Sequence, residues 1–270
     1  MIGQTNLQSR LEQLIENDTF PRFSIFVGPK GSGKKTLLLE MFEGIYLEDN
    51  KVDSVRKMIE MVYKVGNRTF IMPDADIMSV AAKNALLKVI EECPNDNYFI
   101  MTLEDEENTL ETIRSRGTVF HMDRYTPDEI LEYAIDTFRN ELQDQKSRDI
   151  IKELCETPGD VQTLYKANIL EFYDYVQLVV DNIAEVSLAN AFKIPSKLAL
   201  KDDAEGYDLR LFLKAFYKIC GDRFFINLEQ KYGDGLAATQ TALQQLRIKG
   251  INKQMLIDNW ILEIRESWQN

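Results

Sequence analysis

The sequence is poor in cysteine and histidine and has no long apolar run, and each shortage excludes a class of protein. Its three cysteines, Cys93, Cys155 and Cys220, lie far apart, which fits neither a disulfide framework nor a zinc site, so we expect reduced, buried thiols. The one histidine, His121, lies inside an apolar run and is expected in the core. No run reaches the roughly 18 apolar residues of a transmembrane helix. We therefore expect a cytoplasmic protein without a membrane partner.

Acidic residues outnumber basic ones, 44 against 32, and the formal net charge is −12. Such a charge repels nucleic acid at long range unless the basic groups are clustered. We therefore expect weak DNA binding by this chain alone. A length of 270 residues with 44% hydrophobic and 28% charged residues is typical of a globular protein with two or three domains.

The first 124 residues alternate short apolar runs with helical patterns. This alternation predicts strands joined by helical crossovers in a mostly parallel sheet, an α/β domain. The expected strands are Ser24–Val27, Thr69–Met72, Tyr98–Thr102 and Thr118–His121. The expected helices are Leu37–Tyr46, Val52–Val65 and Val80–Glu92, where apolar residues recur at spacings of three and four.

The strand pattern stops near residue 124, where Thr126 to Glu129 form a capping box with proline at the first helical position. Everything after it is helical in pattern, with expected breaks at Gly221 and at Tyr232 to Gly235. We therefore divide the chain into an α/β domain (1–124), a small helical domain (125–168) and a terminal helical domain (169–270).

The last helix carries an apolar stripe formed by Leu256, Trp260 and Ile264. Residues at this spacing lie on one face of a helix. The stripe belongs either to an intramolecular core or to a contact with another subunit, and the sequence leaves both open.

A glycine-rich run with the G-x-x-x-x-G-K spacing of a phosphate-binding loop follows the first expected strand and precedes a helix. Glycines let backbone N–H groups turn toward a phosphate, the amino end of the helix favours an anion, and Lys34 can reach the β and γ phosphates. The candidate nucleotide-binding residues are Gly28, Pro29, Lys30, Gly31, Ser32, Gly33, Lys34, Lys35 and Thr36.

The eighth position of this loop departs from the pattern. A serine or threonine normally binds magnesium there, but the residue is Lys35, and Thr36 comes one place too late. An ammonium group cannot bind a cation, and a second positive charge disfavours Mg²⁺. The loop is therefore expected to hold nucleotide rather than hydrolyse it, with magnesium doubtful.

Sequence motifs of the clamp-loader ATPases, which belong to the AAA+ class, resemble three further stretches of this chain, 84–92, 98–102 and 112–117. These ATPases include the DNA polymerase III δ′ and γ/τ subunits and replication factor C. The box at 2–4 and the loop at 28–36 extend the resemblance, the loop being similar to that of the replication factor C subunit at the δ′ position. The resemblance implies a P-loop AAA+ domain, a helical lid and an all-α collar that joins five such subunits.

The family's spacing from Asn84 places Pro73 at the metal-binding aspartate and Asp74 at the catalytic glutamate. The resemblance thus implies a degenerate site in which Asp74 is the remaining acid. A shifted alignment would instead make Asp74 and Asp76 a metal pair. Their alternative role is to cap the following helix.

Arg116 aligns with the family's S-R-C motif, which implies that it reaches the γ-phosphate held by a neighbouring subunit. Its alternative is a surface pair with the acidic run 104–107. Gln162 lies where hydrolysing members carry a sensor arginine. Lys83 and Lys88 lie on a helix that faces DNA or the next subunit in this family, but each is more simply a solvated lysine.

Taken together, these features predict a δ′-like subunit that binds ATP or ADP with little hydrolysis of its own. The implied partners are the other subunits of a hetero-pentameric clamp loader, the sliding clamp and primer–template DNA. Two alternatives remain. One is a self-sufficient P-loop ATPase or nucleotide kinase that uses Lys34 and Asp74, and the other is a helical scaffold with a vestigial loop.

Overall fold

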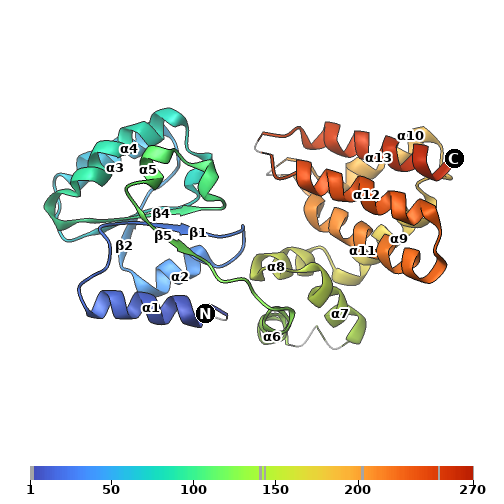
Figure 1. Ribbon diagram of the computed structural model, residues 1–270, viewed down its shortest axis with the longest axis horizontal. Coiled ribbons are helices and arrows are strands. Elements are labelled where there is room, and N and C mark those ends of the chain that lie inside the picture. Colours follow the sequence, from blue (N-terminus) through green and yellow to red (C-terminus); the bar gives the residue numbers. More distant parts are fainter. Residues whose placement is uncertain (1–2, 140–141, 143, 202–203, 249, 270) are drawn as a thin grey trace. The chain divides into compact units, whose positions relative to one another are not determined.

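The computed structural model describes residues 3–139, 142, 144–201, 204–248 and 250–269. The chain forms two compact units (Figure 1). The first consists of Met1–Glu129 and Glu156–Gly159, and the second of Ile130–Cys155 and Asp160–Asn270. Residues on both sides of position 168 belong to the second unit, and the division into a lid and a collar stays a prediction about their roles.

The first unit is built on a five-stranded parallel sheet with the order β2-β3-β4-β1-β5. Its strands are β1 (Phe23–Val27), β2 (Gly44–Tyr46), β3 (Thr69–Met72), β4 (Tyr98–Leu103) and β5 (Thr118–His121). Its helices are α1 (Thr5–Glu16), α2 (Lys34–Met41), α3 (Val52–Val62), α4 (Val80–Glu92) and α5 (Glu111–Arg114), with short 3₁₀ turns η1 (Ala75–Ile77), η2 (Pro94–Asp96) and η3 (Glu106–Asn108). The predicted α/β class is confirmed.

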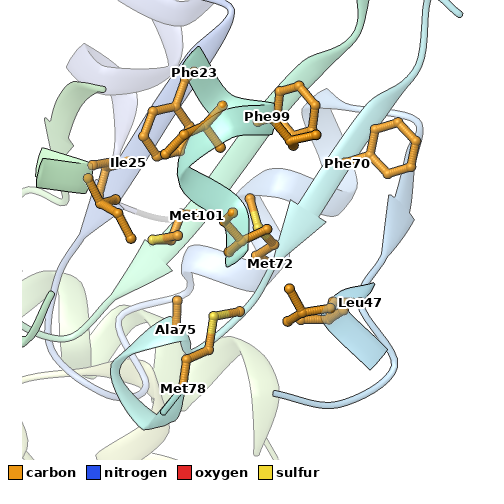
Figure 2. Close-up of a cluster of buried hydrophobic side chains, with 14 of the residues drawn as sticks. Phe23, Ile25, Leu47, Phe70, Met72, Ala75, Met78, Phe99 and Met101 are labelled. Carbon is orange, nitrogen blue, oxygen red and sulfur yellow. The ribbon is translucent and has the colours of Figure 1, made fainter. Parts of the chain in front are cut away.

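Apolar side chains fill both faces of this sheet. All five residues of β1 are buried, and because successive residues of a strand point to opposite faces, Ile25 and Phe26 belong to different cores. Phe26 packs with residues of α1 and α2. Ile25 packs in the second core, which includes residues of α3 and α4; Figure 2 shows part of it. This double burial explains the continuous apolar runs of the sequence.

The expected helix at Leu37–Tyr46 is wrong in its second half. Helix α2 ends at Met41, Phe42 is extended, and Gly44–Tyr46 form strand β2 beside β3. A Cβ on Gly44 would lie 2.5 Å from Ile71 Cδ1, so the glycine permits this close pairing. The core placement of His121 is also wrong, because its neighbour Phe120 takes the inward position on edge strand β5 and His121 is exposed.

The second unit is helical apart from a two-stranded ladder. Its elements are α6 (Pro127–Thr137, which begins in the first unit), α7 (Gln145–Leu154), α8 (Pro158–Lys166), α9 (Ile169–Asn182), α10 (Leu188–Ala191), η4 (Ile194–Lys197), β6 (Leu198–Ala199), β7 (Tyr207–Asp208), α11 (Leu209–Asn227), α12 (Gln230–Gln245) and α13 (Lys253–Gln269). The capping box before α6 forms in both directions, Glu129 N to Thr126 Oγ1 and Thr126 N to Glu129 Oε2. In the part of the chain that is described, no helix is long and apolar enough to cross a membrane.

For this unit the structure decides one alternative that the sequence left open and corrects one expectation. The stripe on α13 is intramolecular, since Trp260 is 2% exposed and its Nε1 donates to Thr239 Oγ1 at 3.0 Å. The breaks at Gly221 and Gly235 do not occur, because these glycines lie inside α11 and α12. A Cβ on Gly235 would lie 2.9 Å from the Trp268 ring, so this glycine serves close packing rather than a turn.

The segment before α1 is tied to the segment after β5 by one buried side chain. Gln4 is fully buried, its Nε2 donates to Asp123 O at 2.9 Å, and its Oε1 accepts from Asp123 N at 2.8 Å. Ile2, from the same predicted box, lies outside the described residues. Gln4 therefore closes the first unit across 119 residues of sequence.

Replacing Gln4 tests this tie. Gln4→Ala removes both hydrogen bonds from a buried site, and we expect the free energy of unfolding to fall by about 1–3 kcal/mol. Urea denaturation followed by far-UV circular dichroism measures the change. The matched control, Gln13→Ala on the exposed face of α1, should stay within about 0.5 kcal/mol of the parent. Equal losses in the two variants would contradict the assignment.

Candidate nucleotide site

The predicted phosphate-binding loop lies between β1 and α2. It begins at Gly28, whose N–H donates to Leu103 O at the end of β4, and it passes through two residues with positive φ, Gly31 at 79° and Gly33 at 87°. These left-handed conformations favour glycine and turn the backbone around the amino end of α2. The loop therefore adopts the strand–loop–helix context that the motif requires.

Lys34 is the buried cation of this loop, at 7% exposure. Its Nζ donates to Gly28 O at 2.5 Å and to Pro29 O at 3.1 Å. Burial lowers the pKa of Lys34 from its usual value, and the negative charges of Glu104, Asp74 and Asp76 partly offset that effect. The ammonium group is thus held inside the loop, next to where a phosphate would bind.

The amino end of α2 fits an anion. Its N-cap is Gly33, without a side-chain hydrogen bond, and its first turn has no acidic residue. Ser32 Oγ is buried and has no hydrogen-bond partner among the described residues. No side chain among the described residues caps the amides of this helix end or accepts from the hydroxyl, so these donors fit a phosphate group. Lys35 and Thr36 are exposed on the same turn.

The two aspartates after β3 have different roles. Asp74 is exposed, its φ is +49°, and its N–H donates to Thr102 Oγ1 at 2.8 Å. Asp76 is buried, and its carboxylate accepts from Glu104 N at 2.8 Å and from Asp105 N at 3.4 Å. The expectation that their side chains cap the following helix is wrong, because Asp74 lies at the N-cap position of η1 without a side-chain hydrogen bond, and Ser79 caps α4.

A resident magnesium ion does not fit this donor set. Position 35 is a lysine, position 73 is a proline, and both carboxylate oxygens of Asp76 accept hydrogen bonds from backbone amides. Within the described ranges, no group of three or more His, Cys, Asp or Glu side chains is arranged to hold a metal ion. The loop therefore fits a phosphate group better than a protein-bound cation.

Arg116 follows α5 and is bound to α4. Its Nε and Nη2 donate to Glu91 Oε2 at 3.3 and 3.2 Å, and its Nη1 donates to Thr112 O at 2.7 Å. The expected alternative partner, the acidic run 104–107, is therefore wrong. The side chain of Arg116 is 35% exposed and that of Glu91 is 61% exposed, so this is a weak surface pair that can exchange for another anion.

Several residues at the loop were not found from the sequence. Tyr125 OH donates to Ser32 O at 2.8 Å, and Gly159 N donates to Gly31 O at 3.0 Å. A Cβ on Gly159 would lie 2.5 Å from Gly31 Cα, so a glycine is needed on both sides of this approach. No sequence spacing signals such contacts, because their partners are distant along the chain.

Gln162 of α8, for which the resemblance implies a sensor position, donates its amide to Tyr133 OH at 2.6 Å within the second unit. The two lysines of α4 differ in burial. Lys88 is exposed and pairs with Glu92 at 3.7 Å, as a solvated lysine would. Lys83 is only 4% exposed, so its expected solvated placement is wrong.

Comparisons with known proteins find matches over part of the chain. A family model described as DNA polymerase III, delta subunit, matches residues 47–126, a range that includes β3, β4 and α5. Replication factor C subunit 3 of Schizosaccharomyces pombe is 27% identical over 149 residues, which are 48% of this chain and 43% of that protein. Replication factor C small subunit 1 of Pyrobaculum islandicum is 27% identical over 215 residues, which are 72% of this chain and 64% of that protein.

The match to the Schizosaccharomyces pombe protein thus spans less than half of that protein's length. Among solved structures, the Thermotoga maritima RuvB Holliday junction branch migration motor aligns with a TM-score of 0.52 at 20% identity, covering 83% of this chain and 77% of that one. At this identity the likeness concerns the fold alone, a P-loop sheet domain followed by helices. The chain is therefore similar in sequence, over part of its length, to clamp-loader subunits of the replication factor C and DNA polymerase III type, and its fold is similar to that of the RuvB motor.

Proposed function

We propose that this chain is a δ′-like subunit of a sliding-clamp loader. It binds ATP or ADP in the loop around Lys34, turns the nucleotide over slowly, and supplies Arg116 to nucleotide held by a neighbouring subunit. The observation that carries this proposal is that the site has its phosphate-binding groups but lacks its magnesium-binding groups. Lys35 and Pro73 occupy the positions where side chains that position Mg²⁺ are expected.

The surroundings of Arg116 support a role in trans. The guanidinium is partly exposed and is held by one surface carboxylate and one backbone carbonyl. A phosphate carries more negative charge than Glu91 and accepts the same forked hydrogen bonds. Exchange of Glu91 for a neighbour's γ-phosphate therefore costs little and provides charge where hydrolysis needs it.

Assembly with other loader subunits is proposed to use the second unit, with residues 125–168 as lid and 169–270 as collar. Three large apolar side chains at the turn between α11 and α12 support this role, since Phe225, Ile226 and Leu228 are 86%, 76% and 77% exposed. Exposed apolar clusters mark contact surfaces. The sliding clamp and primer–template DNA are proposed partners of the complex, since the net charge of −12 disfavours DNA binding by this chain alone.

The isolated chain should bind nucleotide without turning it over efficiently. We expect ATP and ADP to bind in isothermal titration, and phosphate release to stay below about one per second, the lower end of competent enzymes. The control is Lys34→Ala, which removes the buried ammonium and should weaken binding. Turnover above that rate, lost on Asp74→Ala, would favour a self-sufficient ATPase or kinase. Absence of nucleotide binding would favour a vestigial loop.

In the assembled complex, substitutions of Arg116 and of Lys34 should have different effects on ATPase activity. Arg116→Ala should lower the ATPase activity stimulated by DNA and clamp, because a trans arginine contributes about 10³-fold or more to the step it serves, while other sites keep part of the total. Lys34→Ala should leave most of the activity. Steady-state phosphate release from complexes that co-purify with the tagged chain measures both.

Arg56→Ala and Lys57→Ala on the exposed face of α3 are the matched controls. They should leave the ATPase activity of the complex unchanged. If Lys34→Ala silences the complex and Arg116→Ala leaves it active, this subunit is a motor with its own active site.

A further inference from the structure

The segment between β4 and α5 is held at both of its ends by buried charged side chains. At its start, Asp76 accepts from the backbone N–H groups of Glu104 and Asp105. At its end, Lys83 Nζ donates to Asn108 O at 2.5 Å. Since no side chain of the segment takes part in these bonds, they fix its backbone path.

Lys83 also bridges to the turn that carries Asp76. Its Nζ lies 3.4 Å from Asp76 O, and Lys83 and Asp76 are 4% and 7% exposed. A buried ammonium is costly unless its donors are satisfied. The position of Lys83 on α4 is therefore coupled to the two backbone segments that it joins.

Helix α4 contacts both this segment and Arg116. Lys83 binds Asn108, and Glu91, eight residues further along the same helix, binds Arg116. Eight helical residues span about 12 Å, and the chain from Asn108 through α5 to Arg116 runs between these two tethers, with α5 in contact with α4. Of the two tethers, only the one at Lys83 is buried.

The hydrogen bonds around Asp76 and Lys83 lie next to others that reach the phosphate-binding loop. Leu103, immediately before Glu104, accepts from Gly28 N, and Thr102 accepts from Asp74 N. Hydrogen bonds at Leu103, Glu104 and Asp76, joined by the backbone between Leu103 and Glu104, thus link the first loop glycine to Lys83.

We propose that Lys83 is a positioning residue that fixes the segment 104–116 on α4 and thereby sets the position from which Arg116 reaches a neighbouring subunit. This inference rests on the proposed trans role of Arg116. Lys83 touches no nucleotide; it acts through the backbone that leads to Arg116. A purely structural lysine would instead stabilise the fold and affect every activity alike.

The test uses the complex that co-purifies with the tagged chain. Lys83→Met keeps an unbranched side chain that is one atom shorter, and it removes the charge and the hydrogen-bond donors. A displacement of Arg116 on the order of 1 Å can cost about 10²-fold at the step it serves, so we expect total stimulated ATPase to fall by up to about tenfold. Lys88→Met, at an exposed lysine of the same helix, is the matched control and should leave the activity unchanged.

A double-mutant cycle separates positioning from general stability. In complexes that already carry Arg116→Ala, Lys83→Met should cause no further loss, and ATP binding to the isolated Lys83→Met chain should match the parent. An equal fold-loss in both backgrounds would overturn the proposal. So would full activity of Lys83→Met where Arg116→Ala lowers it. If Arg116→Ala alone has no effect, the proposed function itself fails.

A second variant is used if Lys83→Met does not assemble. Asp76→Asn leaves one acceptor oxygen for the backbone amides of Glu104 and Asp105 in place of two, removes the carboxylate charge, and changes the side-chain volume little. We expect a smaller loss of stimulated ATPase with the same non-additivity toward Arg116→Ala. Additive losses for Asp76→Asn would overturn the proposal in the same way.

Discussion

The nucleotide site depends on the hydrogen bonds that hold the buried ammonium group of Lys34 inside its loop. This buried ammonium donates to two backbone carbonyls of its own loop, at Gly28 and Pro29. Among the described residues, no side chain caps the amino end of α2 and none binds the hydroxyl of Ser32. A phosphate supplies the missing acceptors for these donors. Strands β1 and β4 are buried in the sheet, and the loop that follows β1 lies at their carboxyl ends, where a phosphate can reach it.

The acids near this loop serve structure more than chemistry. Asp76 uses both carboxylate oxygens on backbone amides, and the N–H of Asp74 is held by Thr102. Their charges still favour the protonated form of Lys34. A loop with free phosphate-binding groups, next to acids that bind backbone amides, is suited to holding nucleotide. Under the proposed function, the partly exposed Arg116 would act on nucleotide bound by another subunit.

Local patterns predicted most of the sheet and the loop. Strands β3 and β5 have the expected bounds, because short apolar runs between turn residues have few other uses. Strand β2 was missed because its three residues continue the apolar pattern of α2, and only pairing with β3 makes them extended. The burial of Lys83 and the Tyr125–Ser32 contact were missed for a related reason. Their partners are backbone groups distant in sequence, and such contacts produce no regular spacing of residues in the sequence.

We propose that Arg116 acts on a neighbour's nucleotide while Lys34 holds the nucleotide of this chain. The structure of the assembled complex with a slowly hydrolysed ATP analogue distinguishes these two roles. We expect nucleotide in the loop at Lys34, and an Arg116 guanidinium nitrogen within about 3 Å of a γ-phosphate oxygen bound by the adjacent subunit. An Arg116 that remains on Glu91, with no residue of this chain near the adjacent γ-phosphate, would contradict it.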